Sequence, residues 1–334
     1  MNYQGIFITV AVLSIALNGC QKAPDSRNVN GAIVAAQNTE MWTETEKSVT
    51  NNIEENEDIE NVNILASNGE INFMVTGNID IPEQIKSGIL VKKDYSKEQL
   101  QSVFCPDAEL EKSLEYGQDM EVWIEKEKND SDRWSKKLEL SVLGCSFSNY
   151  ELDHKYISMD DGVVDESESK TLQENLMQTL KQLGVNYGID VVKAYGEGMN
   201  KYYDYTLILK INDIACITNG NAEVQVTGDA KVSNEGIGSI WLSDNLVVNQ
   251  SENIKVEAYN NAITWMKSCV RQKLINPSGT INITEIQLRY MIDKSDGEYS
   301  FHPVWLLRNI EDGILYNYAA FNAVNGNLEY YSGM

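Results

Sequence analysis

The chain has 334 residues, of which 42% are hydrophobic, and its 50 acidic residues outnumber its 27 basic residues to give a formal charge of −23. This composition excludes disorder throughout, and the length suggests about two domains that each bury a core. The acidity excludes nucleic acid as a partner, because binding to phosphates requires a surplus of Lys and Arg.

The N-terminus has the features of an export signal. Residues 6–17 form an apolar run that is too short for the roughly 20 residues of a spanning helix and suits a signal-peptide core. The following Leu17-Asn18-Gly19-Cys20 resembles the lipobox of bacterial lipoproteins, in which the cysteine receives a diacylglyceryl anchor. We therefore expect a signal peptide over 1–19, lipidation of Cys20, and a body held at the outer face of the cell membrane. An uncleaved helix or an ordinary secretory signal is the alternative. Residues 1–19 lack the Lys and Arg with which a signal peptide usually opens.

The next segment, residues 20–60, is polar and acidic and ends in the run Glu54-Glu55-Asn56-Glu57-Asp58. It lacks the alternation of a strand, and its spacing of acids is not that of a calcium loop. We expect an acidic tether, partly helical over 32–52.

Residues 61–150 are predicted to form a first α+β module. Apolar residues alternate over 71–81, as in a half-buried strand, and resume over 88–92. Ser96 and Gln99 have the spacing of a helix start, and two further alternating segments form a hairpin near 120–142.

An acidic connector over 151–168 is expected to separate that module from a second one over 169–334. A helix is predicted between Thr171 and Gly184, and another within 254–274. Each is followed by alternating segments joined by turn signals such as Asp296-Gly297 and Asn325-Gly326. The pattern is a helix followed by an antiparallel meander, twice.

Several stretches resemble a known group of proteins. His302-Pro303-Val304-Trp305, the segment Tyr318–Leu328 and the strand from Tyr205 resemble PepSY-like regulatory modules, although the turn at Ile214-Ala215-Cys216 lacks the glycine and proline of that pattern. With the lipobox and tether, the chain resembles uncharacterised lipoproteins of gut Firmicutes that carry a domain of unknown function. The resemblance implies an α+β fold of the cystatin/PepSY-like kind, with antiparallel sheets each packed against a helix in two modules after the tether. It implies no catalytic residue.

A search for catalytic patterns predicts no catalytic residue, no metal site and no cofactor. The two histidines, His154 and His302, stand in no metal-ligand spacing, and nucleotide-binding and hydrolase motifs are absent from the sequence. A pair of carboxylates of the glycosidase type stays open, because 50 acids bring some pair together by chance.

Beyond Cys20 there are four cysteines, at Cys105, Cys145, Cys216 and Cys269. Two readings stay open, disulfides or buried thiols, and the pairings that keep each bridge within one module are Cys105–Cys145 and Cys216–Cys269.

Tyrosines gather in the second module as adjacent or alternating residues. In each adjacent double one ring is expected to face outward and to offer a contact surface, although half-buried sheet positions also suit Tyr. The candidate partner-contact residues are Tyr202, Tyr203, Tyr316, Tyr318, Tyr330 and Tyr331.

The sequence thus predicts a membrane-anchored extracytoplasmic lipoprotein that binds or regulates without catalysis, its partner being another envelope protein or a peptide. One alternative is a cell-envelope enzyme, such as a glycan hydrolase that uses a carboxylate pair. The other is a peptidase inhibitor of the PepSY type, for which an exposed strand edge would be expected.

Overall fold

The computed structural model describes residues 59–75, 81–113, 120–127, 130–153, 161–197, 201–220, 223–311 and 314–332. Cys20, the signal peptide and the tether up to residue 58 lie outside the described residues. Within the described ranges, no helix is both long enough and apolar enough to cross a membrane.

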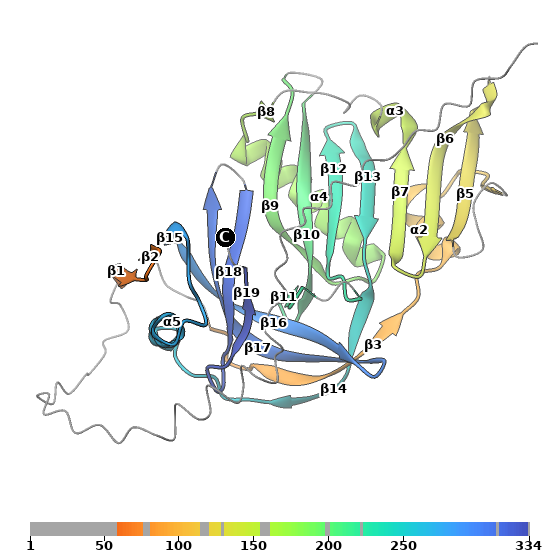
Figure 1. The fold of residues 1–334 in the computed structure, drawn as a ribbon. Coiled ribbons are helices and arrows are strands. Elements are labelled where there is room, and N and C mark those ends of the chain that lie inside the picture. The colour runs from red at the N-terminus through yellow and green to blue at the C-terminus, as the bar shows by residue number, and fades with distance from the viewer. Residues whose placement is uncertain are drawn as a thin grey trace, which may run out of the picture. The chain divides into compact units, whose positions relative to one another are not determined.

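The described residues form nineteen strands and four helices, so the protein is mostly β (Figure 1). The helices are α2 (Lys97–Phe104), α3 (Tyr150–Asp153), α4 (Glu166–Gln182) and α5 (Asn261–Arg271). The strands that precede α4 are β1 (Ile59–Leu65), β2 (Gly69–Val75), β3 (Lys86–Lys93), β4 (Glu111–Lys112), β5 (Met120–Glu127), β6 (Asp130–Ser141), β7 (Gly144–Asn149) and β8 (Asp161–Gly162). Those that follow are β9 (Tyr187–Tyr195), β10 (Tyr202–Ile211), β11 (Ile214–Thr218), β12 (Thr227–Ser233), β13 (Gly236–Leu242), β14 (Asn245–Asn253), β15 (Gly279–Ile283), β16 (Glu285–Ser295), β17 (Glu298–Glu311), β18 (Ile314–Asn322) and β19 (Leu328–Tyr331).

Sixteen of these strands form one sheet, and β1, β2 and β15 form a separate sheet of three. The large sheet has two parts. We call them the β10 part, which holds β4–β10, β12 and β13, and the β17 part, which holds β3, β11, β14 and β16–β19. Most pairs are antiparallel, but β11 pairs with β16, and β15 with β2, in parallel, so both sheets are mixed.

The two parts meet at the tight hairpin between β10 and β11. Its two turn residues, Asn212 and Asp213, have φ angles of 48° and 66°, a left-handed conformation that Asn and Asp tolerate better than other non-glycine residues. Because β11 then pairs with β16, this hairpin carries the chain from the β10 part into the β17 part.

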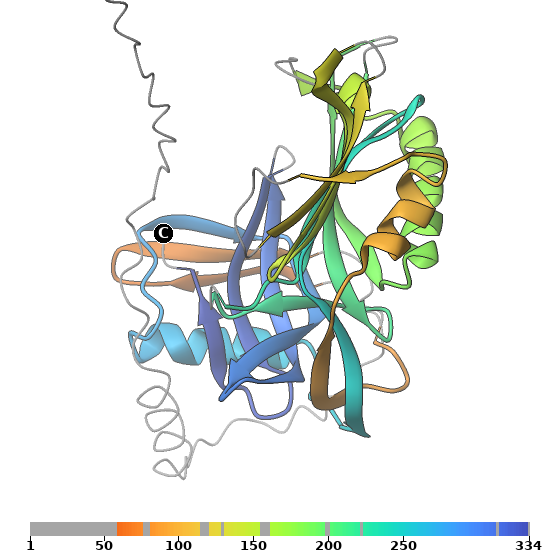
Figure 2. The same ribbon diagram turned by 90° about the vertical axis from the view of Figure 1, so that its right-hand side faces the viewer.

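The helices lie against different parts of the sheet. Figure 2 shows α2 and α4 together on one side of the β10 part. The Tyr205 hydroxyl donates to the Ser169 carbonyl of α4, at 3.0 Å. Helix α5 covers the β17 part, where its Trp265 lies 6.1 Å from the ring of Phe321. Both interfaces belong to one continuous apolar core.

The predicted fold class is wrong. The sequence indicated small antiparallel sheets that each pack against one helix, whereas the structure has a large mixed sheet and is mostly β. The physical reason is strand pairing at long range: β3 pairs with β14 and β17, and β7 pairs with β13, so that open sheet edges are covered by further strands.

These same pairings place strands from 61–150 and from 169–334 in one sheet. The boundaries predicted for the tether, the connector and the two modules are not tested by them and stay predictions.

Candidate binding site

A cavity of about 570 Å³ lies where the two parts of the large sheet meet. Its walls come from β9, β10, the β10–β11 hairpin, the segment 284–289 that includes the start of β16, and Arg308 of β17, with Val75 and Pro82 at one side. Segments that are distant in sequence therefore build this cavity.

Two arginines and one aspartate form the polar centre of the cavity wall. Arg289 Nη2 and Arg308 Nη1 each donate to Oδ1 of Asp190, both at 2.9 Å. Arg289 is 6% exposed and Arg308 is 3% exposed, so both guanidinium groups are buried. Two cations thus share a single carboxylate oxygen in the interior.

Strand geometry explains why Asp190 points to this place. The ladder between β9 and β10 pairs Val191 with Thr206 and Ile189 with Leu207, which leaves Asp190 as the extra residue of a β-bulge. A bulge redirects the side chain of its extra residue, and here that side chain reaches across to the β17 part.

Neighbouring side chains fix both guanidinium planes. Glu285, Gln287 and Arg289 are alternate residues of β16 and share one face, while Arg308 lies opposite Glu285 on β17. Gln287 Oε1 accepts from Arg289 Nε at 2.9 Å. Glu285 Oε2 accepts from Arg308 Nε at 2.7 Å. The two arginines are therefore held by side chains from two strands, β9 and β16.

The cluster keeps its charges at neutral pH. Burial alone would raise the pKa of Asp190, but the attraction of Arg289 and Arg308 outweighs it and holds that pKa below its ordinary value. Burial lowers the pKa of Arg289, and the charge of Asp190 opposes that effect. Since the ordinary pKa of arginine lies far above neutral, the Arg289 guanidinium group stays protonated.

Donors are left over on both arginines. The hydrogen bonds above use Nε and Nη2 of Arg289 and Nε and Nη1 of Arg308, so Arg289 Nη1 and Arg308 Nη2 donate to no acceptor in the described part of the chain. Neither nitrogen is fully enclosed by protein atoms. Because both residues line the cavity, these donors have access to its space.

A second hollow, of about 850 Å³, lies between the end of α4 and the start of β9. Lys181 is its only charged lining residue within the described ranges, and it has no buried charged centre. The cavity at the sheet junction is therefore the better candidate for a binding site, because it has fixed polar groups among apolar walls.

The four cysteines of the body are all buried free thiols, so neither disulfide that the sequence left open is formed. Burial raises the pKa of the Cys145 thiol to about 12 and that of the Cys269 thiol to about 11. A thiol with such a pKa is not a nucleophile at neutral pH. Cys105, Cys145, Cys216 and Cys269 therefore act here as small apolar residues.

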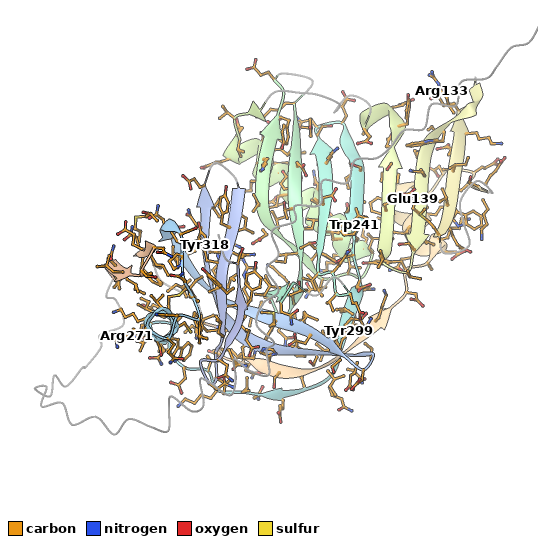
Figure 3. All side chains as sticks on the ribbon, viewed as in Figure 1. Arg133, Glu139, Trp241, Arg271, Tyr299 and Tyr318 are labelled. Atoms are coloured by element: carbon orange, nitrogen blue, oxygen red, sulfur yellow. The ribbon has the colours of Figure 1, made fainter. Side chains whose placement is uncertain are left out.

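None of the candidate contact tyrosines is fully exposed. Tyr202, Tyr203 and Tyr318 are buried, whereas Tyr316, Tyr330 and Tyr331 are half-buried. The expectation that one ring of each double faces outward is not met at residues 202 and 203. The Tyr202 ring stacks on Tyr195 of the neighbouring strand, with centroids 5.1 Å apart, and the Tyr203 hydroxyl donates to Glu168 at 2.6 Å. Figure 3 labels Tyr318 within the β17 part.

The nearest match to a catalytic carboxylate pair lies outside both hollows. Asp204 and Asp229 occupy adjacent strands, β10 and β12. Burial raises the pKa of Asp204, and burial together with the charge of Asp204 raises the pKa of Asp229. Trp241 lies opposite Asp229 on β13 and is labelled in Figure 3. Across the described residues, no group of three or more His, Cys, Asp or Glu side chains is placed to hold a metal ion.

Sequence reasoning missed Asp190, Arg289 and Arg308. The two arginines are 99 and 118 residues from Asp190, and no local spacing joins them. A usable signal was present, because each is a charged residue that directly follows apolar strand residues: Ile189-Asp190, Leu288-Arg289 and Leu306-Leu307-Arg308. Charged residues are almost never fully buried unless they are paired, so such interruptions point to buried partners.

The fold and the site together define a mostly β protein with a charged cavity at the junction of two sheet parts. No family model matches the chain, and no curated protein matches it. An uncharacterized protein from Eubacterium rectale has a similar solved structure, with a TM-score of 0.55 and 13% identity over 92% of this chain and 99% of that one. YycH from Bacillus subtilis matches with a TM-score of 0.38 and 10% identity over 77% of this chain and 56% of that one. The first likeness supports the fold alone.

Proposed function

We propose that the protein is a lipid-anchored extracytoplasmic binding protein and that the cavity at the sheet junction is its binding site. The anchor would be a diacylglyceryl group on Cys20, as the motif Leu17-Asn18-Gly19-Cys20 indicates. The single observation that carries the binding role is the pair of buried arginines, whose unused donors open into a cavity of about 570 Å³. Ligand cavities in proteins have this size and this mixture of apolar walls with a few fixed polar groups.

Stability alone does not account for this cluster. Burying ion pairs costs a desolvation penalty that apolar side chains of similar volume avoid, so a buried charge cluster is weak evidence for a stabilising role. Groups with perturbed pKa values that gather at a cavity are more often found at functional sites. The remaining donors have the geometry to select a ligand with acceptor atoms.

The cavity can be tested by narrowing it. Ile189 of β9 lines the cavity, whereas Val191, two residues further along the strand and equally half-buried, does not. Full-length Ile189→Trp and Val191→Trp are compared with wild type for retention of compounds from a low-mass envelope extract, measured by mass spectrometry. Wild type and Val191→Trp should retain a compound that Ile189→Trp loses.

Two results of this experiment would refute the binding role of the cavity. One is the same retention by all three proteins. The other is an absence of retained compounds when the unfolding midpoints show that all three are folded.

The envelope enzyme remains a second candidate because of Asp204 and Asp229, whose raised pKa values suit a general acid. Hydrolysis of purified peptidoglycan by wild type, and its loss in Asp229→Asn, would favour this candidate. The PepSY-type inhibitor, for which an exposed strand edge is expected, stays a third candidate, although the large mixed sheet differs from the small sheet-and-helix units of that resemblance.

A further inference from the structure

The cavity meets β16 at the edge of the strand. All six consecutive residues from 284 to 289 line it. Since successive side chains of a strand point to opposite faces, a hollow on one face would be lined by alternate residues only. A wall of consecutive residues therefore means that the backbone edge of β16 borders the cavity.

The first part of this edge, over 285–289, pairs with no strand in the described part of the chain. On one side β16 pairs with β17 along its whole length, from Glu285 to Ser295. On the other side β11 pairs only with Tyr290, Met291 and Ile292. The stretch 285–289 thus has a free edge, and an open strand edge accepts an extended peptide by forming main-chain hydrogen bonds.

The charges around this edge suit a carboxylate. Arg289 Nη1 and Arg308 Nη2 are the unused donors described above, and Lys210 also lines the cavity and forms no ion pair with a described residue. Guanidinium groups bind carboxylates with short, charge-assisted hydrogen bonds. Of the three acidic residues in the lining, Asp190 and Glu285 are engaged by the arginines, and Asp213 is exposed at the turn between β10 and β11.

Most of the remaining wall is aliphatic and would accommodate small apolar side chains, with Asp213, Thr284 and Gln287 as its polar residues. Its aliphatic residues are Val75, Ile189, Ile208, Ile214, Ala215, Ile286 and Leu288. At about 3.3 Å per residue, the free edge over 285–289 is long enough for about five residues of extended peptide.

We propose that the ligand of this cavity is a short apolar peptide with a free C-terminal carboxylate, which adds as a strand to the free edge of β16 and places that carboxylate on Arg289 and Arg308. This inference rests on the proposed binding function and names its ligand class. It explains together the free edge, the unused guanidinium donors and the aliphatic wall.

The test uses two peptide pools that differ in one group. Both are acetylated pentapeptides of random uncharged sequence, one ending in a carboxylate and the other in a carboxamide, and full-length protein is offered each at equal concentration. We expect wild type to retain the carboxylate pool at least about tenfold better, because the amide lacks the charge that the arginines bind. A third pool with N-methylated backbones should be retained as poorly as the amide pool, because N-methylation prevents strand pairing.

Arg308→Lys is the informative variant, because lysine keeps the charge but lacks the second donor of the fork. Its retention of the carboxylate pool should fall toward its retention of the carboxamide pool. The matched control is Arg271→Lys on α5, where Arg271 is exposed and remote from the cavity lining (labelled in Figure 3). Its preference should equal that of wild type.

Several results would overturn the inference. They are equal retention of the carboxylate and amide pools by wild type, undiminished retention of the N-methylated pool, or an unchanged preference in folded Arg308→Lys. If wild type ignores all peptides while Ile189→Trp still loses a compound from the extract, the peptide ligand is refuted and the binding function stands. If both experiments fail, the binding function fails as well.

Discussion

At the scale of single residues, Asp190 is the residue on which the site depends most. Its one carboxylate holds two buried guanidinium groups, and it has this position only because it is the extra residue of a bulge. Removing one partner of a buried ion pair leaves a charge without compensation, which costs far more than the pair itself contributes.

We predict that Asp190→Asn lowers the free energy of unfolding by about 3–5 kcal/mol at pH 7, as measured by urea denaturation. The pKa of Asp190 is depressed in the folded state, so its contribution is complete above the unfolded-state pKa of about 3.9 and is lost as the pH falls through the folded-state value. The difference between wild type and variant should therefore shrink below about pH 4.

Asp213→Asn is the control for this variant. Asp213 also lines the cavity, but it is exposed and forms no ion pair with a described residue, so its replacement should change stability by less than about 0.5 kcal/mol. Equal losses for Asp190→Asn and Asp213→Asn would show that Asp190 does not hold the arginines.

At the scale of elements, local sequence signals predicted starts and turns well. Helix α2 begins where Ser96 and Gln99 indicated, and the Ser96 hydroxyl accepts from the Gln99 N–H at 3.1 Å. The turn at Asp296-Gly297 joins β16 to β17, with φ angles of 53° and 84°. Helix α4, however, begins at Glu166 with Asp165 as its N-cap, five residues before the predicted Thr171. Because Asp165 lies within an acidic run, the sequence did not distinguish it as an N-cap.

The turn at Asn325-Gly326 shows how a short loop is fitted to a helix. Gly326 has a φ of 75°, and a Cβ at this position would lie 2.5 Å from Cε2 of Trp265 on α5. A side chain here is therefore opposed both by the backbone conformation and by the indole ring.

We predict that Gly326→Ala destabilises the protein by about 1–3 kcal/mol more than Gly220→Ala, as measured by urea denaturation. Gly220 is the matched control, because its φ of 86° imposes the same backbone strain but open space surrounds the position of its Cβ. Equal losses of stability for the two variants would mean that Trp265 moves aside without lowering the free energy of unfolding.

At the scale of the whole molecule, the joining of strands into sheets could not be predicted from the sequence. Alternation locates a strand and its buried face, but it does not say which strand lies beside it. The parallel pair of β11 and β16 and the antiparallel pair of β7 and β13 join residues far apart in the chain. The candidate site depends on the first of these pairs, because β11 joins the β10 part to β16 and so brings Asp190 to Arg289 and Arg308.

The proposed membrane anchor is tested on the whole protein in a bacterial host. Wild type should incorporate a radioactive fatty acid and sediment with the membrane. Cys20→Ser should do neither, because two or three acyl chains hold a protein stably whereas no other anchor is proposed. Labelling of Cys20→Ser to the level of wild type would refute lipidation at this residue.

Hydrogen–deuterium exchange of the full-length protein, with and without the compound that it retains from the envelope extract, locates the binding site most directly. If the cavity at the sheet junction is the site, exchange will slow at the backbone amides of residues 285–289 and of Ile189 and Asp190, which line it. Slower exchange confined to the second hollow, at Met177, Lys181 and Tyr187, with no change along β16, would place the ligand there and contradict the binding role of the cavity at the sheet junction.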